Sequence, residues 1–152
     1  PVKQHLSNLM LGQELILTEF CRPALSFSVP LTLFGNLNIQ AGLDIKRGGI
    51  FPLVHGIRAL SLAHGVTVNN TFERIEQLVN KNVLEQSTAD NLNEALKQFF
   101  KWRLSQRLSQ QHSSNKINVK LMERADRDLL RHSLHVVKKF KQWLGYHYQI
   151  RD

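Results

Sequence analysis

The sequence predicts an all-α fold: a helical bundle of five to six helices with one short β-hairpin. Apolar residues recur at helical spacing in several separate segments, and a strand-like alternation occurs only around Ala41 and Gly42. No long linker rich in proline, glycine or serine interrupts the 152 residues. Residues 1–152 are therefore expected to form a single helical domain, with a core of adequate size for its length.

Residues 2–11 and 13–27 are expected to form the first two helices. Their apolar stripes are supplied by Leu6 in the first helix and by Leu15, Leu17 and Phe20 in the second. Pro23 is expected to bend or end the second helix, because proline cannot donate the backbone hydrogen bond of a helix interior.

The next segment carries the alternating pattern. Leu37, Ile39, Leu43 and Ile45 are apolar at every second position around the Ala41-Gly42 turn. This pattern predicts a short hairpin with one apolar face. Asp44 and Lys46 are expected on its polar face.

Residues 51–64 are apolar nearly all round, with Pro52 in the first turn and Gly65 at the end. A helix of this kind is expected at the centre of the bundle. Asn70, with Glu73 three residues later, is expected to cap a further helix.

Two longer helices complete the bundle. The first begins near Ser87 and carries a stripe that runs from Leu92 to Leu108. Residues 110–120, which are rich in Ser, Asn and Lys, are expected to form an exposed loop. The last helix, from about residue 126 to 144, is expected to bury Leu130, Leu134, Val137 and either Phe140 or Leu144.

The composition limits the possible classes of protein. A single cysteine, Cys21, excludes a disulfide framework, and its expected role is that of a small buried hydrophobe. No segment has the length of apolar sequence that a membrane span needs, and the start of the chain has no signal-peptide form, so a cytoplasmic location is expected. The chain begins without Met and is expected to be the C-terminal fragment of a larger protein. Its net charge of +8 permits binding to nucleic acid.

A set of short motifs indicates a family. Asp44, Ile45 and Lys46 precede Gly49-Ile50 and Pro52-Leu53-Val54, and Arg58 follows the proline by six residues. Further motifs are Leu62 to Val66, Asn70 to Arg74, Trp102-Arg103-Leu104 and Arg127 to Val137. With these motifs the chain resembles the nucleotidyltransferase substrate-binding domain, the helical C-terminal domain of GlnD-like signalling nucleotidyltransferases. It departs from the family pattern at Ser105-Gln106-Arg107, where the family often has Arg-His-Gln.

The resemblance implies a noncatalytic domain attached to a nucleotidyltransferase domain, with cyclic-nucleotide-binding and CBS modules further upstream. A nucleoside triphosphate and magnesium are then expected in the parent protein, and no cofactor in this chain. The residues agree, because the chain lacks a Gly-Ser phosphate loop and has no Asp-x-Asp pair on a strand. Whether the parent protein is an active enzyme stays open.

The candidate substrate-binding residues carry charge within or beside apolar segments. They are Asp44, Lys46, Arg47, Arg58, Arg74 and Arg103. Arg58 lies in the most apolar helix and is expected to point inward, where it needs a carboxylate partner. It either forms an internal ion pair with Asp44 or Glu73, or faces a pocket for an anionic ligand together with Lys46 and Arg74.

Arg103 continues the core stripe of its helix. It either snorkels at the end of the bundle or points into the same pocket.

Three functions therefore remain open. The first is substrate binding, of a protein or a nucleotide, for an attached nucleotidyltransferase. The second is nucleic-acid binding, which only the charge supports. The third is a protein-interaction or oligomerisation domain in which the arginines are structural.

Overall fold

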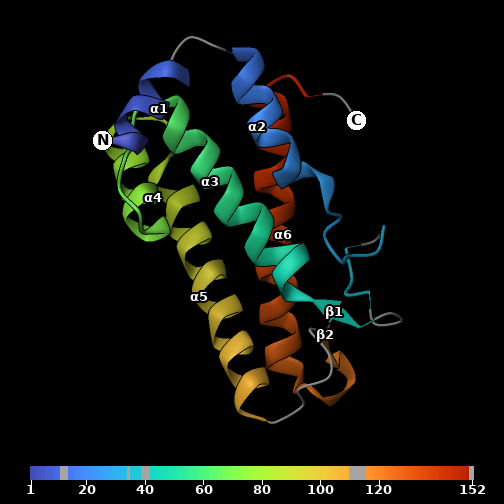
Figure 1. The fold of residues 1–152 in the computed structure, drawn as a ribbon. Helices are drawn as coiled ribbons and strands as arrows, with labels where there is room; N and C mark the ends of the chain where they lie inside the picture. Colours follow the sequence, from blue (N-terminus) through green and yellow to red (C-terminus); the bar gives the residue numbers. More distant parts are fainter. Residues whose placement is uncertain (11–13, 34, 39–41, 110–115, 151–152) are drawn as a thin grey trace.

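The computed structural model describes residues 1–10, 14–33, 35–38, 42–109 and 116–150 (Figure 1). These residues form six α-helices, which are α1 (Val2–Met10), α2 (Glu14–Ser26), α3 (Phe51–Ala63), α4 (Thr71–Asn80), α5 (Gln86–Leu108) and α6 (Arg124–His147). Two short strands, β1 (Leu43–Asp44) and β2 (Lys116–Ile117), pair antiparallel. The all-α prediction with a small two-stranded element is confirmed.

Helix α3 is central, as predicted. It packs against α2, α4 and α6, and eight of its residues are buried. It crosses α6 closely at Gly56, where an added Cβ atom would lie 2.5 Å from Leu144 Cδ1. The helix ends at Gly65, whose φ of 71° is readily adopted only by glycine.

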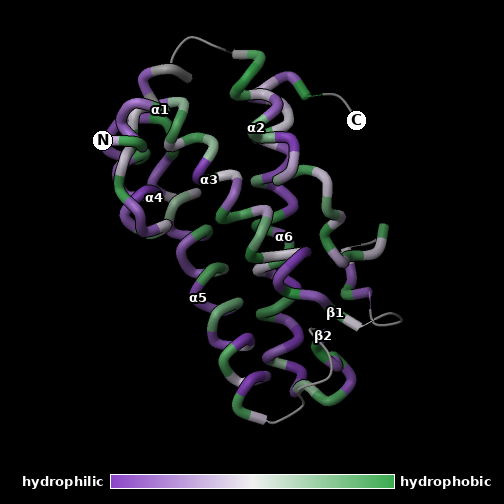
Figure 2. The backbone as a smooth tube through the Cα atoms, viewed as in Figure 1, coloured by the Kyte–Doolittle hydropathy of each residue, from purple (hydrophilic) through white to green (hydrophobic). Residues whose placement is uncertain are grey.

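Helices α5 and α6 form a long antiparallel pair connected at the bottom of Figure 1. Figure 2 shows hydrophobic and hydrophilic residues alternating along both, as expected for helices with one buried face. The apolar residues predicted for the core face of α6 are buried, and of the two alternatives Phe140 and Leu144 both are. The stripe of α5 is buried from Leu92 to Trp102, but Leu108 is 73% exposed, so the prediction is wrong for the last turn of the helix.

Asn70 caps α4 as predicted. Its side-chain Oδ1 accepts a hydrogen bond from the Phe72 backbone N–H at 2.9 Å. This cap stabilises the first turn of α4. It thereby also fixes the backbone position of Arg74, whose N–H donates to the Asn70 carbonyl oxygen.

The sheet is located differently from the predicted hairpin. Leu43 and Asp44 pair with Ile117 and Lys116, which come from the segment predicted to be a loop. Ile39 lies outside the described residues, and Leu37 forms an isolated bridge with Leu31. Alternation alone indicates a strand but not its partner, so the pairing across more than seventy residues was not predictable.

The prediction of an exposed loop for residues 110–120 is wrong for the part from residue 116 on. Strand β2 is followed there by a 3₁₀ helix, η2 (Val119–Leu121), and Val119 is buried. Residues 110–115 lie outside the described part of the chain.

A π-helical turn, η1 (Lys46–Ile50), leads directly into α3. Lys46 is therefore helical, and its predicted place on a strand face is wrong. Its carbonyl accepts a hydrogen bond from the Phe51 N–H, the i to i+5 spacing of a π-helix. Gly49 is buried against the ring of Phe99 on α5, where a side chain would clash. The chain therefore leaves the strand after Asp44 and continues as a helical turn packed on α5, where the predicted hairpin strand would have extended to Lys46.

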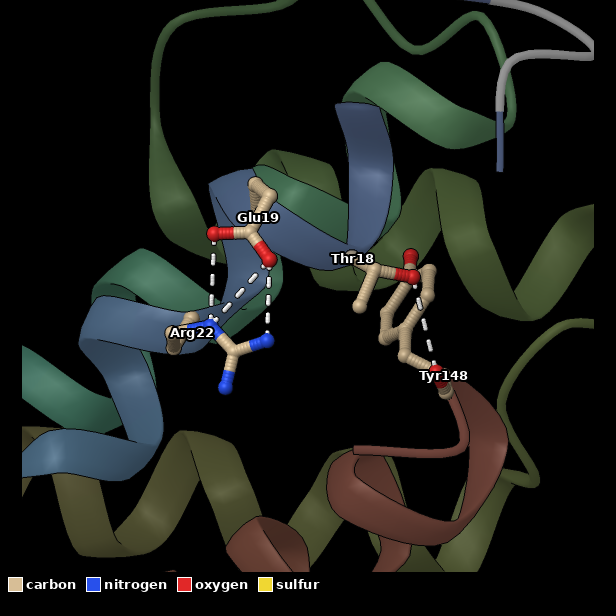
Figure 3. Close-up of polar contacts among 4 residues, drawn as sticks. All are labelled: Thr18, Glu19, Arg22 and Tyr148. Carbon is tan, nitrogen blue, oxygen red and sulfur yellow. Dashed lines mark hydrogen bonds and ion pairs between the residues drawn. The ribbon is translucent and has the colours of Figure 1, made fainter. Parts of the chain in front are cut away.

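Helix α2 continues through Pro23 to Ser26, so of the two predicted effects of the proline, ending the helix is wrong. Leu17 is buried, but Leu15 is 77% exposed and Leu6 of α1 is 40% exposed, so both were wrongly assigned to the core. Figure 3 shows how α2 meets the end of α6, where Thr18 Oγ1 donates to the Tyr148 carbonyl oxygen at 3.5 Å. On the solvent side of the same turn, Glu19 and Arg22 form an exposed ion pair.

Candidate anion-binding site

Stacked rings line the contact between α2 and α3. The Phe20 and His55 rings lie 5.0 Å apart and nearly parallel, and His55 stacks in the same way on Phe51 at 5.3 Å. Phe51 meets Phe27 edge-on at 5.3 Å. We call these four residues the ring ladder. His55 Nε2 also donates to the Phe20 carbonyl oxygen at 2.8 Å, which fixes the central imidazole in the ladder.

Arg58 extends the ladder at one end. Its guanidinium carbon lies 5.7 Å from the centre of the Phe20 ring, at cation–π distance. Arg58 is the only exposed residue of α3, so the prediction that it points inward is wrong. The physical reason is that Arg58 is at the most solvent-accessible position of α3, whose other residues are buried or half-buried, and this spares the charge the cost of desolvation.

The predicted ion pair of Arg58 is also wrong. Among the described residues, neither Asp44 nor Glu73 forms an ion pair with it, and Glu73 is exposed. Asp44 is bound elsewhere, because its carboxylate accepts from the Arg47 N–H at 3.1 Å and lies 4.0 Å from Arg47 Nε.

Arg74, in the first turn of α4, is the neighbour that Arg58 has instead. Arg74 is half-buried, and its Nε donates to the Val68 carbonyl oxygen at 2.8 Å. Burial lowers the pKa of Arg74, and the positive charge of Arg58 lowers it further. The two arginines are therefore close enough to repel each other.

No carboxylate of the described chain offsets this repulsion. Neither Arg58 nor Arg74 takes part in an ion pair there. With one edge of Arg74 held by Val68 and one face of Arg58 against Phe20, the remaining N–H groups are oriented donors. Such an arrangement suits an anion with several acceptor oxygens, such as a phosphate or a carboxylate.

The other candidate residues lie elsewhere. Arg47 sits at the opposite end of the ring ladder, with its guanidinium 5.9 Å from the centre of the Phe27 ring. Eleven residues of helix separate it from Arg58, about 16 Å along an α-helical axis, so the two do not meet at one small anion. Lys46 is exposed in the first turn of η1. Arg103, on α5, is half-buried and has an interaction partner of its own.

Sequence reasoning missed the ring ladder. Phe51 and His55 are four residues apart on a helix, a spacing that places them on one face and could have indicated their contact. Phe20 and Phe27 come from another helix region, and no local pattern predicts that they join the same stack.

Residues 14–148 match the family described as "Putative nucleotidyltransferase substrate binding domain". The chain belongs to this family. No curated protein and no solved structure is significantly similar to it. The match covers the ring ladder, both arginines and all the motifs that carry the resemblance.

The family description assigns a role in substrate binding for a nucleotidyltransferase. Within the described part of the chain, no three His, Cys, Asp or Glu side chains are grouped so that they could hold a metal ion. No helix described in the structure has both the length and the hydrophobicity to cross a bilayer.

Proposed function

We propose that this chain is the noncatalytic substrate-binding and regulatory domain of a signalling nucleotidyltransferase that resembles the protein-PII uridylyltransferases, and that Arg58 and Arg74 receive an anionic group of the substrate. The observation that carries the proposal is that the charge of Arg58 acts on Arg74, and that neither arginine forms an ion pair with a carboxylate in the described chain. An anion placed between them removes their repulsion, so its binding is favoured electrostatically.

Preorganisation supports this role. Long arginine side chains lose rotamer freedom when they bind a ligand, which weakens binding. Here Phe20 restrains Arg58 and the Val68 carbonyl restrains Arg74 before any ligand arrives. The site therefore loses less conformational entropy on binding than two unrestrained surface arginines would.

The parent protein is part of the same proposal. An attached catalytic domain would bind the nucleoside triphosphate and magnesium, and cyclic-nucleotide-binding and CBS modules would regulate it in the cytoplasm. This chain would contribute no cofactor ligand. Its task would be to hold the nucleotide or the acidic side chain of a target protein near the catalytic domain.

Calorimetric titration with inorganic pyrophosphate and with UTP tests the site. Arg58→Ala and Arg74→Ala should each weaken binding by about tenfold or more, since each removes charge-assisted hydrogen bonds worth about 1.5 to 3 kcal/mol. Arg124→Ala is the matched control, because Arg124 is an exposed arginine in the first turn of α6.

If all three variants lost the same affinity, binding would depend on the overall positive charge of the chain and not on a site at Arg58 and Arg74. Binding of a single-stranded oligonucleotide with a steep salt dependence, insensitive to Arg58 and Arg74, would favour nucleic-acid binding instead.

A further inference from the structure

A second surface, which shares no residue with the arginine pair, lies between the segment after α2 and the last turns of α6. These two parts of the chain run side by side on the right of Figure 1. They enclose an open groove of about 1250 Å³. Its lining combines polar and aromatic residues with aliphatic ones, among them Leu25, Val29, Leu31 and Ile150.

Several large side chains with apolar surface are exposed to solvent in the groove. Leu33 is 99% exposed on one wall, and Tyr146, on the opposite wall, is 89% exposed. Trp143 is 37% exposed beside them. Large apolar residues gathered in one concave place indicate a surface that a partner covers.

The charge of the groove identifies the kind of partner. Lys138 and Lys141 line it, and none of the described residues that line it is acidic. The sequence from Leu129 to Ile150 contains no Asp or Glu at all. Lys141 is bound to the Phe27 carbonyl oxygen, whereas Lys138 has no ion pair or hydrogen bond in the described part of the chain. The groove therefore complements a segment that is both apolar and negatively charged.

We propose that this groove binds an acidic peptide segment of a partner protein. Apolar side chains of the segment would occupy the space between Leu33 and Tyr146, and a carboxylate would pair with Lys138. Lys138 and His147, which line the groove from α6, are nine residues apart, about 14 Å at the rise of an α-helix. An extended segment of about four residues spans that length.

Nucleic acid fits the groove less well. Bases bind to single-strand sites by stacking on free aromatic faces. The Trp143 ring already stacks on Phe140 and on His147, with ring planes 12° and 16° from parallel. Tyr146 is the exposed ring that remains, and a single ring does not provide the row of faces on which successive bases stack, so peptide side chains are the better match for Leu25, Val29 and Leu31.

The test uses fluorescence anisotropy with a labelled seven-residue peptide, in which one leucine and one phenylalanine, two positions apart, are surrounded by glutamate. Two control peptides replace the glutamates with lysine or the two apolar residues with serine. The 152-residue chain should bind the first peptide and neither control. Lys138→Glu should weaken binding by at least about fivefold, because it turns an attraction worth up to about 1 kcal/mol into a repulsion.

Lys139→Glu is the matched control. It makes the same charge change at the next residue, which lines a different groove beside Val83 and Phe140. Tyr146→Ser tests the apolar part of the site and should also weaken binding, without a cost in folding because Tyr146 is so exposed.

The proposal is overturned if Lys138→Glu and Lys139→Glu lower the affinity for the peptide equally, since binding would then depend on the overall charge of α6. It is also overturned if the serine control peptide binds as well as the first peptide, or if a poly-dT oligonucleotide competes for the groove with higher affinity. Loss of binding in the Lys138 and Tyr146 variants with retention in the Lys139 variant supports it.

Discussion

The close crossing of α3 and α6 at Gly56 leads to a prediction about stability. Gly56 is buried, and a Cβ atom at this position would lie 2.5 Å from Leu144 Cδ1 and 2.8 Å from Phe140 Cε1. Leu144 is fully buried and Phe140 is 3% exposed, so neither side chain can turn out into solvent. Gly56→Ala should therefore destabilise the fold even though alanine is the better helix former.

The magnitude follows from two opposing effects. Overpacking of a buried position costs about 1 to 3 kcal/mol. Replacing glycine with alanine inside a helix contributes about 1 kcal/mol of stability. Contacts below 3.0 Å to two buried side chains place the cost in the upper part of its range, so the net loss in free energy of unfolding should be about 1 to 2 kcal/mol.

Urea denaturation followed by circular dichroism measures this difference. Gly145→Ala, inside α6, is the matched control, because the nearest atoms to an added Cβ there are 3.8 Å away. That variant should be neutral or more stable by up to about 1 kcal/mol. If Gly56→Ala were as stable as the wild type, α3 and α6 would not approach as closely as the structure shows, and the argument would fail.

Two further predictions concern titratable groups. Burial raises the pKa of the Cys21 thiol to about 11, so Ellman's reagent at pH 8 should label it only as urea unfolds the chain, and rapid labelling of the folded protein would contradict its burial. Burial, and then the charges of His147 and Lys81, lower the pKa of His64 below its ordinary 6.5. The unfolded chain thus takes up this proton first as the pH falls, so the free energy of unfolding should decrease below about pH 6.5, and less in His64→Gln. Equal pH profiles for both proteins would rule out this contribution.

Much of the helical fold was predictable because its signals are local. The Asn70 cap, the glycine that ends α3 and the apolar stripe of α6 each depend on residues within a few turns of one another. The structure has each of them where the sequence placed it. Leu15 and Leu108 were predicted to be buried but are exposed. Both lie near the end of a helix, where fewer neighbouring residues cover a side chain.

Long-range contacts were not predictable in the same way. The pairing of β1 with β2 joins segments more than seventy residues apart, and nothing in the alternation of Leu43 and Ile45 specifies it. The electrostatic effect of Arg58 on Arg74 likewise depends on how α4 packs on α3. The sequence identified both arginines as candidates but predicted a carboxylate partner for Arg58 instead of a second cation.

The hydrophobicity of α3 has two causes that a sequence pattern cannot separate. One part of its surface is apolar because it packs in the core, with Leu53, Ile57 and Leu60 fully buried. Another part is apolar because Phe51, beside His55, contributes to the ring ladder with Phe20 of α2. A helix covered in this way leaves Arg58 as its exposed position, and the Phe20 ring, which covers part of the helix, also lies against the guanidinium. The location of the charge thus follows from the packing, and if the proposed site binds an anion, loss of the Phe20 ring should weaken binding through Arg58 in addition to removing a side chain that packs against the core.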